Sequence, residues 1–308
     1  RSTHLPNLKD LHNHYKIQAV VSGTGLSATA VAKQYEANYA STDYQNVLED
    51  PEVDAVIITT RHNLHAKMVL LALKAGKHVL VEKPLALSSE ELNELDSYII
   101  NTQKNGQFLP ILLTGYNRRF SSFAQRMKEL LSNRSSPFIF NYRMNAGYIP
   151  MDHWVHSDEG GGRNIGEACH IYDLFTYLSD SKVVKVSVNT IIPKTHYYNR
   201  NDNFVTTITF EDGSVCSLTY TALGSEKFPK ETAELFADGK IALMNDYKQL
   251  DIFGARGRPY KKFVQEKGHK KELIAFSEAI KDGEWPIPWW QQKQVAEIAL
   301  EVEKKILL

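Results

Sequence analysis

Short apolar segments alternate with segments of helical periodicity over the first 115 residues, and this alternation restricts the fold more than any other feature. The apolar segments, which are the predicted strands, cover residues 16–22, 53–59, 77–81 and 109–115. Between them, residues 27–35 and 65–75 carry apolar side chains at helical spacing. Apolar strands that alternate with helices are typical of a parallel sheet covered on both faces. The sequence therefore predicts a doubly wound, Rossmann-like α/β domain.

The pattern changes after residue 117, where long segments of alternating polarity replace the short apolar ones. These segments cover residues 183–192, 203–211, 214–223 and 232–237. Asp212-Gly213 separates two of them as a tight hairpin turn. We expect an α+β domain with a large, mostly antiparallel sheet, and a final helix near residues 291–307 that returns toward the first domain. The predicted domains are residues 1–117 and residues 118–308.

Composition excludes several classes of protein. Hydrophobic residues make up 43% of the 308 residues, which is too many for a disordered chain. The 36 basic and 36 acidic residues balance, so no basic surface for nucleic acid is implied. No apolar run approaches the roughly 18 residues of a membrane span. With only Cys169 and Cys216, we expect a reduced, cytoplasmic protein.

Polar residues gather where the predicted strands of the first half end, which is where open α/β sheets bind ligands. They are Ser22, Gly23 and Thr24 after the first strand, Thr59, Thr60, Arg61, His62 and His65 after the second, and Glu82 and Lys83 after the third. Pro84 fixes the backbone beside Lys83, and a lysine shifts its pKa readily when buried. Each cluster alone also fits an ordinary turn, and no acid stands at residues 22–24 to indicate NAD rather than NADP.

The second half offers one polar helix face. In the predicted helix at residues 163–178, Glu167, His170 and Asp173 lie on the same side. A histidine in such a place is either a functional group or a satisfied core residue. No matched second cluster, such as a cysteine pair, accompanies these residues, so we expect no metal site.

Three blocks of sequence resemble the glucose–fructose oxidoreductase/inositol dehydrogenase (Gfo/Idh/MocA) family. The blocks are VDAVIITTRHNLHAKMVLLALKAGKHVLVEKPLAL, LLTGYNRRFSSFA and GGGRNIGEACHIYDLFTYL, and they occur in the order and spacing of that family. The resemblance implies an N-terminal domain that binds NAD or NADP, a C-terminal domain that binds substrate, and homo-oligomers formed through the large sheet, here around residues 203–223.

The resemblance also assigns roles to single residues. It implies that Lys83 and His170 are catalytic and that Asp173 matches a commonly acidic position. The family's catalytic aspartate corresponds to Gly166, and we expect that Glu167 could replace it. The residues expected to bind the cofactor are those at the strand ends given above, together with Arg118. The residues expected to bind substrate are Arg119, Tyr148, Trp154, Arg163, Asn164 and Tyr172, which lie at the domain junction or flank the catalytic helix.

One part of the family pattern is not found in these residues. The first strand and the glycine-rich pyrophosphate loop are missing, and we expect them to precede residue 1. The run NYRMNAGYIPMDHW resembles a subgroup in which such a unit follows a zinc-type alcohol dehydrogenase-like domain. This likeness predicts that the chain is the C-terminal part of a bi-domain oxidoreductase.

The expected reaction is hydride transfer between a nicotinamide cofactor and a secondary alcohol of a sugar, nucleotide sugar or cyclitol. His170 would serve as the base, because the unperturbed pKa of histidine lies near the working pH. Two alternatives remain open at this point. One is a glycoside hydrolase that acts by transient oxidation with tightly held NAD, and the other is a non-catalytic sugar or dinucleotide sensor.

Overall fold

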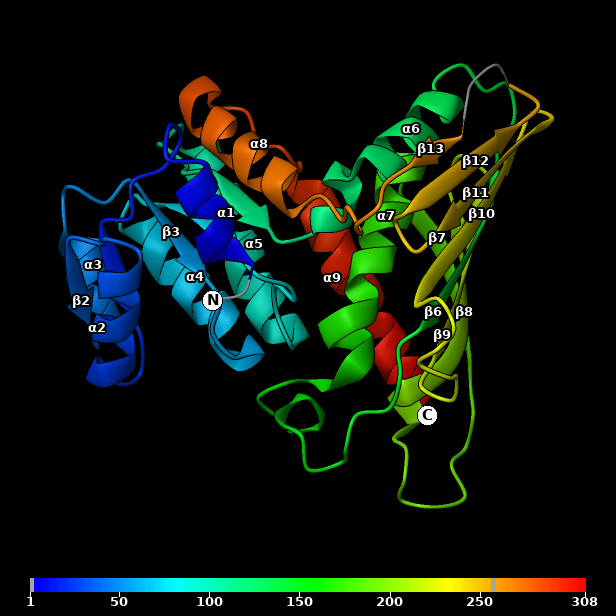
Figure 1. Cartoon of the computed structure of the whole chain (residues 1–308), viewed down its shortest axis with the longest axis horizontal. Helices are drawn as coiled ribbons and strands as arrows, with labels where there is room; N and C mark the ends of the chain where they lie inside the picture. The colour runs from blue at the N-terminus through cyan, green and yellow to red at the C-terminus, as the bar shows by residue number, and fades with distance from the viewer. Residues whose placement is uncertain (1–2, 256–258) are drawn as a thin grey trace.

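A computed structural model describes residues 3–255 and 259–308 and shows parallel strands in the N-terminal part separated by helices from a large sheet in the C-terminal part (Figure 1). The N-terminal part contains α1 (His4–Asp10), β1 (Ala19–Val21), α2 (Gly25–Gln34), β2 (Tyr39–Ser41), α3 (Tyr44–Glu49), β3 (Ala55–Ile58), η1 (His62–Leu64), α4 (His65–Lys74), β4 (His78–Val81), α5 (Ser89–Lys104) and β5 (Leu112–Thr114). Helices and strands alternate here as predicted, although β2 was not among the predicted strands.

All five strands of this part pair in parallel, which confirms the expected Rossmann-like class. They form two pieces, a two-stranded sheet β1-β2 and a three-stranded sheet β3-β4-β5. One hydrophobic cluster joins the two pieces, because Ala19 and Tyr39 pack against buried residues that include Val56. The carboxyl ends of β3 and β4 are in register, with Ile58 opposite Val81.

The C-terminal part supplies the large sheet and the helices that cover its inner face. Its elements are η2 (Asn117–Phe120), α6 (Ser122–Leu131), β6 (Ile139–Asn145), η3 (Trp154–His156), η4 (Asn164–Ala168), α7 (Cys169–Ser179), β7 (Val183–Thr190), η5 (Arg200–Asp202), β8 (Asn203–Phe210), β9 (Val215–Thr221), β10 (Glu231–Ala237), β11 (Lys240–Asn245), β12 (Gln249–Phe253), β13 (Tyr260–Lys261), α8 (His269–Asp282) and α9 (Trp289–Leu307).

Eight strands form this sheet in the order β13-β12-β11-β10-β6-β9-β8-β7. Every neighbouring pair is antiparallel except β6 and β9, so the expected mostly antiparallel sheet is confirmed. The Asp212-Gly213 turn joins β8 to β9, and Gly213 has the positive φ of 83° that a tight hairpin favours. Burial alternates along β8, as expected for a sheet with one covered face.

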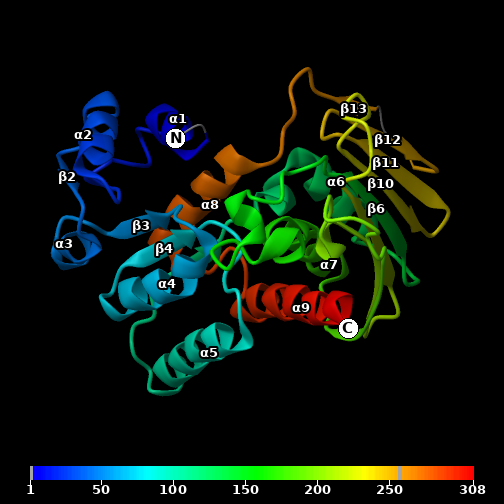
Figure 2. The same ribbon diagram turned by 90° about the horizontal axis from the view of Figure 1, so that it is seen from below.

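The last two helices connect the C-terminal part to the N-terminal part, as the view from below makes clear (Figure 2). Gln292 of α9 accepts hydrogen bonds from the backbone N–H and the hydroxyl of Thr114 at 2.9 and 2.7 Å, and it donates to the Leu112 carbonyl at 2.9 Å. Trp289 of α9 donates to Asp96 of α5 at 2.8 Å and belongs to the N-terminal hydrophobic cluster. The Tyr15 hydroxyl, near α1, donates to the Leu273 carbonyl of α8.

Two further properties concern the described residues as a whole. None of their helices is both long enough and apolar enough to cross a membrane. Cys169 and Cys216 are both buried free thiols.

Candidate active site

Lys83 lies just beyond the carboxyl end of β4, in the position that the sequence analysis singled out. Its ammonium group donates a hydrogen bond to the backbone carbonyl of Gly166 at 2.6 Å, although 83 residues separate the two in sequence. Gly166 belongs to η4, a five-residue π-helix that leads directly into α7. Such π-helical turns are frequent at functional sites. The lysine therefore reaches from the parallel sheet to the start of the helix that carries His170.

His170 lies one turn beyond Gly166 and faces the same charged groups. Its side chain is buried, and its Nδ1 atom has no hydrogen-bond partner among the described residues. Burial lowers the pKa of His170 well below its usual value, and the nearby positive charges of Arg118 and Lys83 lower it further. The imidazole is consequently neutral at neutral pH and has a ring nitrogen free to accept a proton. The structure thus brings together the two residues to which the resemblance gave catalytic roles.

Glu82 makes a contact that nothing in the sequence indicated. Its carboxylate binds His4 of α1, with 2.6 Å between His4 Nε2 and Glu82 Oε1. Burial of this carboxyl group opposes its ionisation, but His4, Lys83 and His269 outweigh burial and lower the pKa of Glu82 to about 2. Glu82 is therefore an anion beside Lys83 at neutral pH.

The two histidines after β3 are both held by backbone carbonyls. His65 is fully buried, with Nδ1 2.7 Å from the Pro84 carbonyl and Nε2 3.2 Å from the Thr60 carbonyl. His62 has Nδ1 2.8 Å from the Gly160 carbonyl, and its ring packs edge-on against Trp154 with 4.7 Å between centroids. His65 links two loops of the N-terminal part, whereas His62 meets the C-terminal part.

Glu167 faces the large sheet. Its carboxylate binds Arg163 at 3.1 Å and Lys230 at 2.7 Å, and it accepts a hydrogen bond from the Tyr220 hydroxyl. Burial opposes ionisation of this carboxyl group, but Lys230 and Arg163 outweigh burial and lower the pKa of Glu167 to about 2. The structure does not bring Glu167 into contact with Lys83 or His170.

The two adjacent arginines of η2 form buried ion pairs. Arg118 binds Glu231 through two hydrogen bonds of 2.8 and 3.0 Å, and Arg119 binds Asp173 through both its Nε and Nη2 atoms. Arg119 also donates to Gln291 of α9 at 2.7 Å. Burial raises the pKa of Asp173 to about 6 despite the opposing effect of Arg119. These contacts join η2 to α7, α9 and β10.

The residues expected to bind substrate lie in several different environments. Tyr148 is partly exposed and stacks on Tyr197 with 4.2 Å between ring centroids. Arg163 is buried and donates to the Gly147 carbonyl at 2.5 Å. Asn164 and Tyr172 are buried and bind each other at 2.7 Å, and Asn164 also binds the Ala299 carbonyl of α9. Trp154, described above, is the one that contacts the loop after β3.

The remaining residues expected to bind the cofactor form an exposed polar edge. Gly23 and Thr24 after β1 are exposed, Ser22 is partly exposed, and Thr59, Thr60 and Arg61 after β3 are exposed. A Cβ atom added to Gly23 would meet nothing within 4 Å, so this edge has open space beside the backbone. An extended anionic ligand with hydroxyl groups fits such a surface at the carboxyl ends of parallel strands. No cluster of possible metal ligands occurs within residues 3–255 and 259–308.

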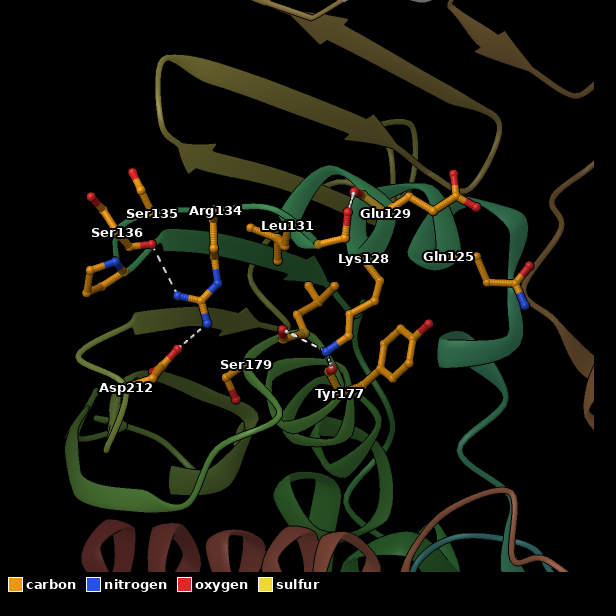
Figure 3. Close-up of a pocket in the computed structure, with 13 residues that line it drawn as sticks. Gln125, Lys128, Glu129, Leu131, Arg134, Ser135, Ser136, Tyr177, Ser179 and Asp212 are labelled. Atoms are coloured by element: carbon orange, nitrogen blue, oxygen red, sulfur yellow. Dashed lines mark hydrogen bonds and ion pairs between the residues drawn. The ribbon is translucent and has the colours of Figure 1, made fainter.

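An open cavity of about 860 Å³ lies at the opposite end of α7 from His170 (Figure 3). Tyr177 and Ser179 line it from the end of α7, and Lys128 and Arg134 line it from α6 and the turn that follows. Both cations are already bound there, Lys128 to the Tyr177 carbonyl at 2.8 Å and Arg134 to Asp212. This cavity is therefore distinct from the Lys83–His170 site.

Sequence reasoning missed His4, His269, Tyr220 and Lys230. Each belongs to the surroundings of Glu82, His170 or Glu167, but each is far from its partner in sequence. No motif or spacing marks them, because only the packing of α1, α8 and the large sheet brings them into place.

Comparisons with known proteins concern the family and the fold. Residues 1–106 match the model of the oxidoreductase family with an NAD-binding Rossmann fold. The scyllo-inositol 2-dehydrogenase (NAD(+)) of Bacillus subtilis is 27% identical over 272 residues, which cover 84% of this chain and 77% of that protein.

Two solved structures share the fold over nearly the whole chain. An oxidoreductase domain protein from Kribbella flavida has a TM-score of 0.85 at 18% identity, covering 99% of this chain and 93% of that one. A levoglucosan dehydrogenase in complex with NADH and levoglucosan has a TM-score of 0.79 at 20% identity, covering 98% and 94%.

The chain matches the Gfo/Idh/MocA family of oxidoreductases over residues 1–106, and its relatives and structural neighbours extend the likeness over most of its length. It is accordingly a dehydrogenase or reductase, and its cofactor is NAD or NADP.

Proposed function

We propose that this protein transfers hydride reversibly between NAD(P) and a secondary alcohol of a sugar, nucleotide sugar or cyclitol. The observation that carries the proposal is the 2.6 Å bond from Lys83 to Gly166, which holds an ammonium group beside the buried, neutral imidazole of His170. A cation that binds an alcohol oxygen and a base that accepts its proton are the two groups that alcohol oxidation requires.

The substrate class is supported by what similar proteins are named for. One relative is a scyllo-inositol dehydrogenase, and one structural neighbour is a levoglucosan dehydrogenase. Both names denote polyhydroxylated rings. Hydrogen-bonding side chains around a neutral imidazole suit such rings better than they suit a long apolar alcohol.

We assign the following roles to the residues of this chain. Lys83 binds the oxygen of the reacting hydroxyl and lowers its pKa. His170 takes the hydroxyl proton on its unpaired ring nitrogen while the C–H bond of the same carbon breaks. When bound, the oxidised nicotinamide ring would supply the hydride acceptor for this carbon. Exposed polar residues at the ends of β1 and β3, namely Ser22, Gly23, Thr24, Thr59, Thr60 and Arg61, would hold the dinucleotide.

Substitution of either proposed catalytic residue tests these roles. Lys83→Ala and His170→Ala should each reduce turnover of a sugar and cyclitol panel about 10²- to 10⁴-fold, because each removes a group that acts on the hydroxyl proton or its oxygen. Nicotinamide absorbance measures the rate, and circular dichroism checks that the variants fold. Exposed His12 and Lys270 provide matched controls, since His12→Ala and Lys270→Ala should keep the rate. Unchanged turnover in a Lys83 or His170 variant would remove that residue from the mechanism.

We also propose that a second copy of this chain binds the open face of the large sheet. Val215, Ile139, Phe236, Ile241 and Phe253 lie opposite one another across five neighbouring strands, from β9 to β12. Three of them, Ile139, Phe236 and Phe253, are exposed. A continuous apolar row on an exposed sheet face is typical of a protein–protein interface.

Light scattering tests the proposed dimer. The chain should have twice its monomer mass, and Phe236→Lys should reduce that mass to one copy, because a lysine in the centre of the row would lose its water without gaining a partner. Leu26→Lys, at an exposed position of α2 away from the large sheet, serves as the control and should leave the mass unchanged. A monomeric chain at micromolar concentration would contradict the proposal.

We further propose that the boundary between the cofactor-binding and substrate-binding domains lies at residues 117–118. It falls between β5, the last strand of the parallel sheet, and the arginines of η2, which are paired with the C-terminal part.

A further inference from the structure

We infer that His62 is a third active-site side chain, whose Nε2 atom accepts a hydrogen bond from a substrate hydroxyl next to the one that reacts. This inference rests on the proposed function and deepens it, because it defines the substrate as a vicinal diol. His62 would then contact the substrate, whereas its position at a strand end alone predicted a contact with the cofactor.

The position of His62 places it beside Lys83. His62 begins η1 at the carboxyl end of β3, and β3 pairs with β4, the strand that leads to Lys83. The side chain is only 7% exposed, and its orientation is fixed by the Gly160 carbonyl and by the edge of Trp154. A residue so constrained presents one defined atom to a ligand.

The imidazole of His62 packs over the backbone that Lys83 contacts. A Cβ atom on Gly166 would lie 3.0 Å from Cε1 of His62, which is closer than almost all real contacts of that kind. The carbonyl of the same glycine accepts the hydrogen bond from Lys83. The imidazole, the ammonium group and the helix turn before His170 therefore meet at Gly166, and the absence of a side chain at this position is what lets the ring lie there.

Hydrogen bonding determines which nitrogen of His62 is free. Nδ1 faces a carbonyl oxygen, which only accepts, so Nδ1 carries the proton and Nε2 has a lone pair. Nε2 has no partner within the described part of the chain. Burial, and to a smaller extent the charges of Lys83 and His65, lower the pKa of His62 to about 4 and keep the ring neutral. His62 is thus a neutral hydrogen-bond acceptor beside the ammonium group of Lys83, which is a hydrogen-bond donor.

A donor and an acceptor that stand side by side fit two neighbouring hydroxyl groups. Lys83 donates to the oxygen of the reacting hydroxyl, and His62 accepts the hydrogen of the adjacent one. A substrate that lacks the second hydroxyl leaves Nε2 without a partner, and an unpaired buried polar group is costly. The site should therefore discriminate strongly between a vicinal diol and its deoxy analogue.

Kinetics with matched substrates test the inference. Wild-type protein should prefer scyllo-inositol to the corresponding deoxy-inositol, and His62→Ala should reduce this preference in kcat/KM about 10²-fold or more, through the diol alone. Gly166→Ala should also lower kcat/KM for the diol, because His62 must move by a few tenths of an ångström to admit the added methyl group. The control is Gly25→Ala, where the nearest atom is 3.8 Å from the added Cβ. A purely structural role would instead lower the rates with both substrates equally, and that result would overturn the inference.

A spectroscopic measurement keeps the inference testable whatever the turnover. In ¹⁵N-histidine spectra of the full chain, the signals of His62 are those that His62→Gln removes. We expect a neutral ring with the proton on Nδ1 between pH 7 and pH 5, and a shift of the Nε2 signal when scyllo-inositol is added with NAD. A proton on Nε2, or an Nε2 signal that scyllo-inositol with NAD leaves unmoved, would overturn the inference. If wild-type turns over no sugar or cyclitol but the Nε2 signal moves, the proposed function fails while the His62 contact stands.

Discussion

Two buried polar regions adjoin α7, one at Asp173 and the other at His170. They differ in how many of their polar groups have a hydrogen-bond or ion-pair partner. In the arginine junction, which is formed by Arg118, Glu231, Arg119 and Asp173, each charge has an opposite charge in direct contact. Around Gly166, by contrast, His170 Nδ1 has no partner in the structure as described. Buried polar groups that lack partners cost stability, so a protein keeps them where a ligand completes them. The arginine junction holds the molecule together, whereas the histidines await a ligand.

We expect the largest change in the free energy of unfolding when the arginine junction is disrupted. Glu231 accepts hydrogen bonds from Arg118, Lys267 and Tyr142 and is fully buried. Glu231→Gln should lower the free energy of unfolding by about 3–5 kcal/mol, because it leaves the Arg118 charge buried without an opposite charge. Urea denaturation measures the change.

The control for this experiment is an exposed ion pair. Lys270 and Asp10 lie 3.2 Å apart with half or more of each side chain exposed, and Lys270→Ala should change the free energy of unfolding by less than about 1 kcal/mol. A loss from Glu231→Gln no larger than that of the control would show that the arginine junction does not hold the fold together.

Acidification should reduce stability by a smaller amount, and this loss depends on the histidines rather than on the arginine junction. Unfolded histidine takes up a proton near pH 6.5, whereas burial lowers the pKa of His62 to about 4, so protons bind the unfolded state more strongly. The contribution of His62 is complete above pH 6.5 and is lost as the pH falls to 4, which amounts to about 3 kcal/mol.

The difference between wild type and His62→Gln isolates this contribution. Urea denaturation at pH 7 and pH 4.5 should show that wild type loses more stability than the variant, because only wild type has this ring to protonate. Equal losses in the two proteins would mean that His62 titrates normally in the folded state.

The sequence allowed the class of fold to be predicted because its evidence is local. Apolar periodicity and the Asp212-Gly213 turn each act within a few residues. The strands β12 and β13 at one side of the large sheet escaped prediction because they are short and gain their stability from pairing, β12 with β11 and β13 with β12. The division of the parallel strands into two sheets likewise depends on pairing between distant segments.

The candidate site was predictable only in part for the same reason. The positions of Lys83 and His170 follow from motifs at a strand end and on a helix. The partners of Arg119 and Glu167 do not, since Asp173 is 54 residues from Arg119 and Lys230 is 63 residues from Glu167. The sequence does not show whether a charged side chain next to a motif faces a ligand or an opposite charge, because only the tertiary packing decides this.

The position of α9 has a consequence for how the chain is made. The segment that completes the hydrophobic cluster of the parallel sheet, through Trp289, and that binds the end of β5, through Gln292, lies 178 residues beyond Thr114 in sequence. Because synthesis runs from the N-terminus, the parallel strands stay incompletely packed until α9 has been made. The N-terminal part therefore reaches its full packing only after the strands of the large sheet have been synthesised.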